Sequence, residues 1–269
     1  MMQESYLANT PETITELDSK VPELPNFITF LHHHFPDVAW IKYLHQWENL
    51  FFSILIAVLV SLIAYIGVRK RQMLPTGLQN FIELGVEKFE NLIVEVLGPD
   101  GRTFVPFLGT LFIYILTMNL FGLIPLMKSP SSNLNITIAL AICVFTLVQF
   151  LNIKNMGIFG FVYHLAGSPK TIVEWILAPF LLMLELISQL ARPITLALRL
   201  FGNVLGEDIL IGTFALLGVT LVMNYSSMGI PLQVPFMFLA LLTSTMQALV
   251  FTLLSTVYIL LSSSHKEKH

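Results

Sequence analysis

Charged side chains are scarce in this sequence. Asp, Glu, Lys and Arg together make up 12% of the 269 residues, whereas 55% are hydrophobic. Soluble proteins carry roughly 25% charged residues. There is no dense basic patch, so nothing in the sequence supports nucleic-acid binding. Long stretches carry no charge at all, and these predict an all-α integral membrane protein.

Cysteine and histidine are scarce as well. The single cysteine, Cys143, can form no internal disulfide. The run His32-His33-His34 cannot converge on one ion from one short segment, so we interpret it as an exposed cluster without a metal. No histidine lies in a predicted span, which speaks against an intramembrane metalloprotease of the His-Glu-x-x-His type. Because no nucleophile, metal cage or phosphate-binding loop is evident, we expect neither catalysis nor a cofactor.

Apolar stretches long enough to enter or cross a membrane occur five times. The stretch at 173–217 exceeds one perpendicular crossing, so it must tilt steeply, bend or lie in the membrane plane. A further helix, at 75–97, has apolar residues on one side and glutamates on the other, which predicts an amphipathic helix on the cytoplasmic surface. The five stretches are 49–68, 103–127, 135–154, 173–217 and 235–261.

Basic residues predict the orientation. Arg69-Lys70-Arg71 follows the first span, Lys154 ends the third, and more basic residues follow the last, so these ends are expected in the cytoplasm. The segment between 154 and 170 is expected to be a cytoplasmic loop. The sequence thus predicts a polar N-terminal segment outside, one membrane-embedded domain and a cytoplasmic tail. Their bounds are 1–47, 48–262 and 263–269.

Polar residues gather between residues 185 and 208, in surroundings that are otherwise apolar. A charge at the bilayer centre costs roughly 2.5–3.5 kcal/mol on insertion scales, so such residues indicate a function. On a continuous helix most of them lie within about 40° of one direction, although Pro193 can bend the helix. We favour a stripe that faces water, an ion path or a charged partner over one that only packs helices. The stripe contains Glu185, Gln189, Arg192, Arg199, Asn203 and Glu207.

Several motifs resemble subunit a of the rotary F-type ATP synthases, the bacterial type in particular. The run Arg199-Leu-Phe-Gly-Asn203, preceded by Arg192-Pro193, is similar to the family signature. Other parts resemble the family in order and spacing, and the resemblance extends from about residue 48 to 261. These parts are Glu185, Met118-Asn-Leu-Phe-Gly-Leu-Ile-Pro125, Asn135-Ile-Thr137 and Gln247-Ala-Leu-Val-Phe-Thr252.

The resemblance implies a non-catalytic stator channel in the bacterial inner membrane. Two long, steeply tilted helices would face a rotating ring of c subunits, and two offset half-channels would carry protons to and from the ring carboxylates. Peripheral-stalk b subunits, the other synthase subunits and membrane lipid would be the further partners. Arg199 matches the essential arginine of the family, and Gln247 matches the glutamine that neighbours it. Either H⁺ or Na⁺ fits the sequence as the coupling ion.

The chain departs from the family pattern at the outer acid of the channel. Asp208 stands where the family commonly has Glu or His, Glu207 where glycine is frequent, and Ala240 where a polar partner is common. Glu207 lies about 80° from Arg199 around the helix, and Asp208 about 180°. We follow the motif and expect Asp208 to be the main relay, with Glu207 and Glu185 in support and Glu185 on the exit path.

A carboxylate-relay secondary ion transporter is the alternative from another class of protein. Many such transporters are built from internal repeats, and the sequence shows none.

Overall fold

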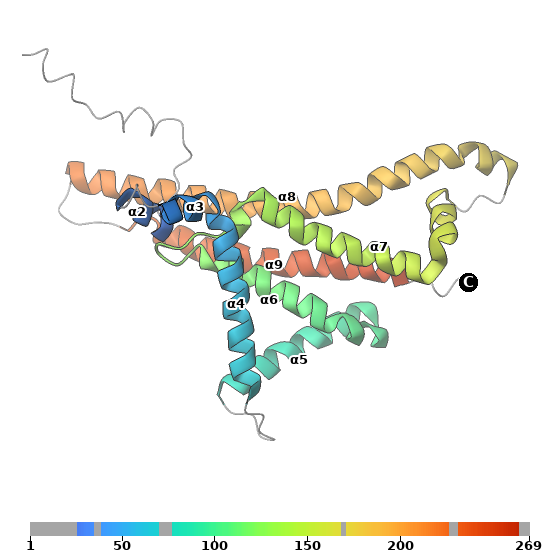
Figure 1. Cartoon of the computed structure of the whole chain (residues 1–269), viewed down its shortest axis with the longest axis horizontal. Helices are drawn as coiled ribbons and strands as arrows, with labels where there is room; N and C mark the ends of the chain where they lie inside the picture. Colours follow the sequence, from blue (N-terminus) through green and yellow to red (C-terminus); the bar gives the residue numbers. More distant parts are fainter. Residues whose placement is uncertain (1–25, 35–38, 70–76, 168–170, 226–230, 264–269) are drawn as a thin grey trace, which may run out of the picture.

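The structure, a computed structural model, describes residues 26–34, 39–69, 77–167, 171–225 and 231–263 (Figure 1). Every regular element in these ranges is helical. They are α2 (Phe27–His34), α3 (Ala39–Gln46), α4 (Glu48–Arg69), α5 (Leu78–Leu97), η1 (Pro99–Phe104), α6 (Val105–Phe121), η2 (Pro130–Ser132), α7 (Leu134–Leu165), α8 (Ile172–Tyr225) and α9 (Val234–Ser263).

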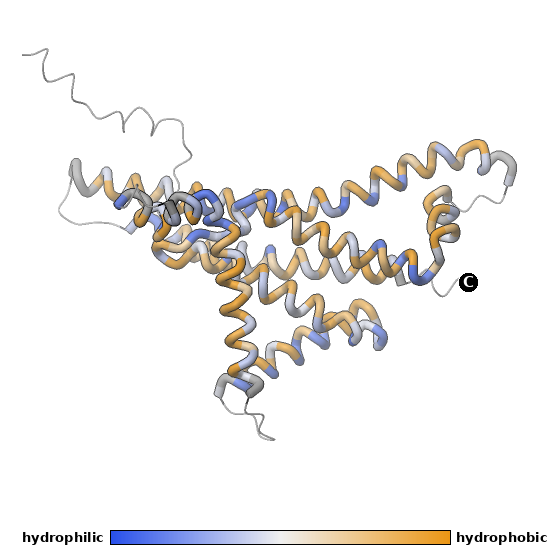
Figure 2. Tube along the Cα trace, viewed as in Figure 1, coloured by the Kyte–Doolittle hydropathy of each residue, from blue (hydrophilic) through white to orange (hydrophobic). Residues whose placement is uncertain are grey.

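Five segments of this helical chain are long and apolar enough to cross a membrane: α4, η1 with α6, α7, α8 and α9. A helix is the natural form for them, because it satisfies its own backbone hydrogen bonds where no water is present. The prediction of an all-α integral membrane protein is therefore confirmed. Figure 2 shows hydrophobic residues along almost all of α4, whereas hydrophilic ones are interspersed along α5. The location of α5 on the cytoplasmic surface stays a prediction.

The core lies where α6 packs against α9 and where α7 packs against α8. Leu108, Ile115 and Met118 of α6 are fully buried there, as are Leu200 of α8 and Phe251 of α9. Figure 1 shows α6, α7, α8 and α9 extended along one general direction, while α4 runs across them. Many large apolar side chains of α4 are exposed, which suits a surface that contacts lipid.

The polar stripe lies on α8, a single helix of 54 residues that contains Pro179 and Pro193. It is longer than the predicted stretch of 173–217, and the expectation of an overlong helix is confirmed. In Figure 1 it extends past α7 and α9, which are its main packing partners. Its tilt relative to a membrane stays a prediction.

The predicted loop at 154–170 is wrong for most of its length. α7 continues to Leu165. Within α7 only Gly157 departs from helical geometry, with φ 70° and ψ 167°. This backbone conformation is essentially restricted to glycine, so Gly157 allows the chain to change direction between two helical pieces. The apolar residues after Gly157 resume the helix. Residues 168–170 lie outside the described ranges.

The predicted span at 103–127 also ends earlier as a helix than expected. α6 stops at Phe121, because Gly122 and Pro125 follow and proline cannot continue a helix. The residues from 122 to 129 form a loop in which Leu126 has a positive φ of 67°. This loop forms one wall of a cavity described below.

The N-terminal segment contains two short helices, α2 and α3, in its described part. The side chains of His32 and His33 lie outside the described part of the chain. The histidine cluster therefore stays a prediction.

Candidate functional site

The first part of the polar stripe faces α7. The side-chain nitrogen Nε2 of Gln149, on α7, donates a hydrogen bond of 2.7 Å to Oε1 of Gln189. Gln189 in turn donates to Oε1 of Glu185 at 3.4 Å. One turn further along α8, the guanidinium of Arg192 lies 5.6 Å from the ring centroid of Tyr258, on α9. This distance is typical of a cation–π contact.

These side chains line a cavity of about 120 Å³ between α7, α8 and α9, which we call the Arg192 cavity. Glu185, Gln189 and Arg192 line it from α8, Gln149 and Asn152 from α7, and Tyr258 and Ser262 from α9. A water molecule occupies about 30 Å³ of the liquid, and buried waters need polar partners. The Arg192 cavity is therefore roomy and polar enough to hold several waters.

The middle of the stripe lies on the surface of the protein. Arg199 and Asn203 are both exposed. Nδ2 of Asn203 donates to Oε1 of Gln247 on α9 at 2.9 Å, and Gln247 is only 4% exposed. Nε2 of Gln247 is buried and has no hydrogen-bond partner among the described residues. Within the described chain Arg199 forms neither an ion pair nor a hydrogen bond, so its charge is open to a partner from outside.

Glu207, at the end of the stripe, joins α8 to α9. Its carboxylate accepts hydrogen bonds from the hydroxyls of Thr243, at 2.5 Å, and Ser244, at 2.8 Å. Ala240, one turn earlier on α9, is buried and offers no polar atom. Thr243 and Ser244 therefore fix the orientation of the Glu207 carboxylate.

A buried network of hydrogen bonds also holds the backbone of Ser244. Nδ2 of Asn119, on α6, donates to the backbone oxygen of Ser244 at 3.3 Å. The hydroxyl of Ser131 donates to Oδ1 of Asn119 at 2.6 Å, and it lies 2.8 Å from the hydroxyl of Ser129. The loop that follows α6 is thus linked through hydrogen bonds to the segment of α9 that holds Glu207.

Asp208 lies in a different environment from its neighbour Glu207. It lines a second cavity, of about 290 Å³, which we call the Asp208 cavity. The walls are the loop from Gly122 to Ser129, Ile211 of α8, Gln233 just before α9, and Met237 near the start of α9. A Cβ atom on Gly122 would lie 2.8 Å from Cβ of Ser129 and 3.5 Å from Oδ1 of Asp208. Glycine at residue 122 lets the loop approach this closely.

The structure thus divides the predicted site residues among four environments. It brings Glu185, Gln189 and Arg192 together, pairs Asn203 with Gln247, and separates Glu207 from Asp208. Gln149, Asn152 and Ser244 were not predicted from the sequence. Gln149 and Asn152 are spaced by one helical turn on α7, and this shared face was the available signal.

Comparisons with known proteins identify relatives along almost the whole chain. A family model described as "ATP synthase A chain" matches residues 50–260. "ATP synthase subunit a" of Protochlamydia amoebophila is 66% identical over 263 residues, which cover 97% of this chain and 96% of that protein. The protein of the same name from Trichlorobacter lovleyi is 39% identical over 214 residues, 80% of this chain and 85% of the relative. That of Solidesulfovibrio magneticus is 37% identical over 218 residues, 81% of this chain and 85% of the relative.

Proposed function

The chain belongs to the ATP synthase A chain family, and on this basis we propose that it is the ion-conducting stator subunit of a rotary ATP synthase in a bacterial inner membrane. Its partners are a ring of c subunits, each with a carboxylate, the b subunits of the peripheral stalk and the rest of the synthase. It is non-catalytic, and ATP chemistry belongs to other subunits. Family membership speaks against the alternative of a secondary ion transporter.

The observation that carries the proposal is the position of two separate cavities on either side of Arg199 along α8. Arg192 and Asp208 are 16 residues apart, which corresponds to about 24 Å of helix. Arg199 lies between them on an exposed surface. Two cavities that do not meet, with a fixed cation between them, are what a pair of offset half-channels requires.

Each cavity is assigned to one side of the membrane. The Asp208 cavity is bounded by the loop after α6, which the charge pattern predicts to be outside, so it serves as the outer half-channel. The Arg192 cavity includes Ser262, close to the basic C-terminal tail that is predicted to be cytoplasmic, so it serves as the inner half-channel. Protons enter through the first and leave through the second during ATP synthesis.

Arg199 controls the charge of the ring carboxylate. In lipid this carboxylate must be neutral, because an unpaired ion in hydrocarbon is very costly. Beside the exposed guanidinium of Arg199 the ionised form is favoured, so the proton is released there. A guanidinium cannot give up its own proton at any physiological pH, so it blocks a direct passage between the half-channels. The attraction between Arg199 and the ring carboxylate stays moderate as long as water and Gln247 also form hydrogen bonds with these groups. A dry ion pair between the two would stop the rotor.

The carboxylates of this chain serve the two half-channels. Asp208 is the main relay of the outer one, because it lines the outer cavity and occupies the position of the acid in the family motif. Glu207 supports it from the α8–α9 interface, where two hydroxyls hold its carboxylate. Glu185 supports the exit path, together with Gln189 and Gln149.

Sidedness of labelling tests the two half-channels. In a Cys143→Ser background, we expect Ile211→Cys in the outer cavity to react with a small impermeant thiol reagent from outside only. Asn152→Cys in the inner cavity should react from the cytoplasmic side only. Val58→Cys, exposed on the apolar face of α4, is the control and should resist the reagent from both sides. Reaction of both cavity positions from one side would refute the assignment.

A further inference from the structure

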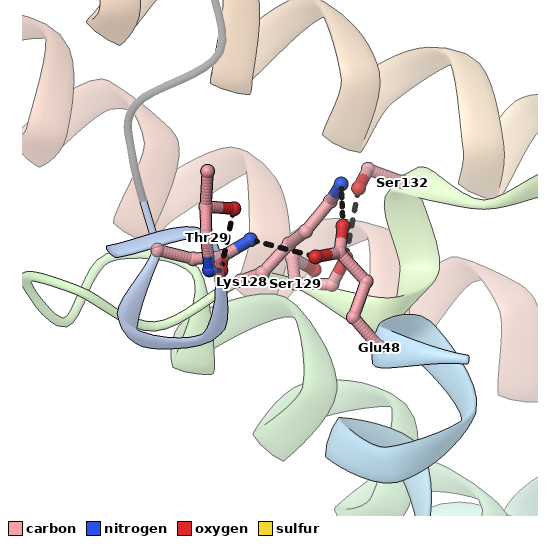
Figure 3. Close-up of polar contacts among 6 residues, drawn as sticks. Thr29, Glu48, Lys128, Ser129 and Ser132 are labelled. Atoms are coloured by element: carbon pink, nitrogen blue, oxygen red, sulfur yellow. Dashed lines mark hydrogen bonds and ion pairs between the residues drawn. The ribbon is translucent and has the colours of Figure 1, made fainter. Parts of the chain in front are cut away.

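Three segments that are distant in sequence meet at one buried carboxylate, that of Glu48 (Figure 3). Glu48 is the first residue of α4. Its Oε1 lies 2.7 Å from Nζ of Lys128, in the loop after α6, and its Oε2 accepts a hydrogen bond from Nδ2 of Asn26 at 3.2 Å. Oδ1 of Asn26 accepts hydrogen bonds from the backbone N–H of Thr29 at 2.7 Å and from its hydroxyl at 2.9 Å. The cluster therefore joins the segment that begins α2 to the first span and to the loop.

The cluster is shielded from solvent. The side chains of Glu48 and Lys128 are 11% and 19% exposed, and Asn26 is 4% exposed. Next to it, Ile28 is buried in the hydrophobic core, so α2 is docked and not merely adjacent. When one member of such a buried ion pair is removed, the other charge loses its compensation, and the loss is much larger than at the surface.

The same N-terminal segment also holds the backbone of the loop. The N–H of Phe27 donates to the carbonyl oxygen of Leu126 at 2.8 Å. Leu126 has a positive φ of 67°, a backbone conformation that non-glycine residues adopt only where the surroundings stabilise it. Leu126, Lys128 and Ser129 all line the Asp208 cavity. The contacts of the N-terminal segment thus end on one wall of that cavity.

We propose that Asn26, Glu48 and Lys128 form a clamp through which the N-terminal segment positions one wall of the Asp208 cavity. They are positioning residues, because they act on the shape of the cavity. The role of this cavity in ion entry rests on the proposed function, but the clamp itself does not. A segment outside the family match thereby helps to keep the outer cavity in the shape that delivers ions to Asp208.

Glu48→Gln and the charge swap Glu48→Lys/Lys128→Glu test the clamp in the assembled complex. The reporter is the labelling rate of Ile211→Cys from outside, in the Cys143→Ser background, and ATP-driven ion pumping is measured in parallel. The matched control removes another ion pair, with Glu90→Gln and Arg102→Met. These two side chains lie 3.1 Å apart but are 36% and 74% exposed, so their pair stabilises little.

With Glu48→Gln we expect the wall of the Asp208 cavity to be held less firmly, so that the labelling rate rises about fivefold or more. A change of this size corresponds to the loss of one contact with a buried charge. ATP-driven pumping should fall in the same variant. The charge swap should bring the labelling rate and pumping back toward the parent values. The control variants Glu90→Gln and Arg102→Met should change neither quantity. If Glu48→Gln does not assemble, Asn26→Ala removes the hydrogen bond to Glu48 and the two from Thr29 but leaves the Glu48–Lys128 ion pair in place, and it should raise labelling about twofold or more.

Labelling that stays at the parent rate in the assembled variant overturns the clamp, whatever happens to pumping. Labelling that rises while pumping is unchanged supports the clamp and counts against the cavity as the ion entrance. Failure of the clamp and failure of the proposed function are therefore told apart.

Discussion

Arg199 is the residue on which the proposed mechanism depends most directly. Arg199→Lys keeps a positive charge but loses the planar guanidinium and can lose its proton when desolvated. We expect ATP synthesis driven by a proton gradient to fall to background while the complex still assembles. Arg199→Ala should in addition let protons leak through membranes stripped of the catalytic sector. Arg102→Lys, at an exposed arginine outside the site, is the control and should behave like the parent.

The two adjacent carboxylates give a second prediction at this scale. Asp208→Asn should reduce pumping more than Glu207→Gln, because Asp208 lines the outer cavity whereas Glu207 is bonded to α9. Pumping in inverted vesicles at equal amounts of assembled complex is the measurement. If Glu207→Gln proves more damaging, Glu207 is the main relay and the family motif does not carry over to Asp208.

The hydroxyls that hold Glu207 predict a third result. Thr243→Val keeps the shape of the side chain but removes the hydrogen bond to a carboxylate, a contact of about 1.5–3 kcal/mol. We expect slower pumping and recovery with Thr243→Ser, which restores the hydroxyl. Equal rates in Thr243→Val and Thr243→Ser would mean that the orientation of Glu207 is unimportant.

Individual residues show where reasoning from the sequence succeeds at the site. The polar stripe was found because polar residues in an apolar helix are conspicuous. The hydrogen bond between Asn203 and Gln247 was not predicted, and the predicted proximity of Gln247 to Arg199 stays a prediction. The division of the stripe among different surroundings was not predicted, because helical angles describe one helix and not its neighbours. Glu48 and Lys128 each lie next to a predicted span in the sequence, and only packing shows that they pair.

Among the helical elements, the first and last spans were predicted best. The first and last spans begin and end within a few residues of the predicted positions. The piece of α7 after Gly157 was missed, because the basic residue Lys154 suggested the end of the helix. A glycine at a change of direction looks the same in sequence as a glycine in a loop.

Gly157 itself provides a prediction for an element. Gly157→Ala forces a side chain into a backbone conformation that favours glycine, at a cost of about 1–3 kcal/mol. We expect a lower melting temperature of the purified complex. Gly85→Ala is the control, because this glycine lies inside α5 with open space around its Cβ position, and it should be neutral or slightly stabilising. A melting temperature that is unchanged in Gly157→Ala would show that this change of direction tolerates a side chain.

For the whole molecule, the orientation in the membrane is open to a direct test. The basic residues after the first, third and last spans predict the N-terminus outside and the C-terminus in the cytoplasm. In a Cys143→Ser background, Ser5→Cys should react with an impermeant reagent applied to intact cells, whereas Lys266→Cys should react only after the membrane is opened. The opposite pattern would invert the assignment of both half-channels. Both positions lie outside the described residues.

At this scale the sequence predicts class and function better than arrangement. Hydropathy and motifs predict the helices and the family, but side chains that face lipid and those that face another helix are equally apolar. The course of α4 across the other long helices therefore had no signal in the sequence (Figure 1).

Pro193 has a consequence for the hydration of the Arg192 cavity. Proline has no N–H, so it cannot donate to the carbonyl of Gln189, the residue four positions earlier in α8. Gln189 and Pro193 both line the Arg192 cavity. The backbone of α8 thereby leaves a carbonyl without its usual helical donor beside a space large enough for water. A residue known for interrupting helices thus leaves the carbonyl of Gln189 available to accept a hydrogen bond from water in the Arg192 cavity.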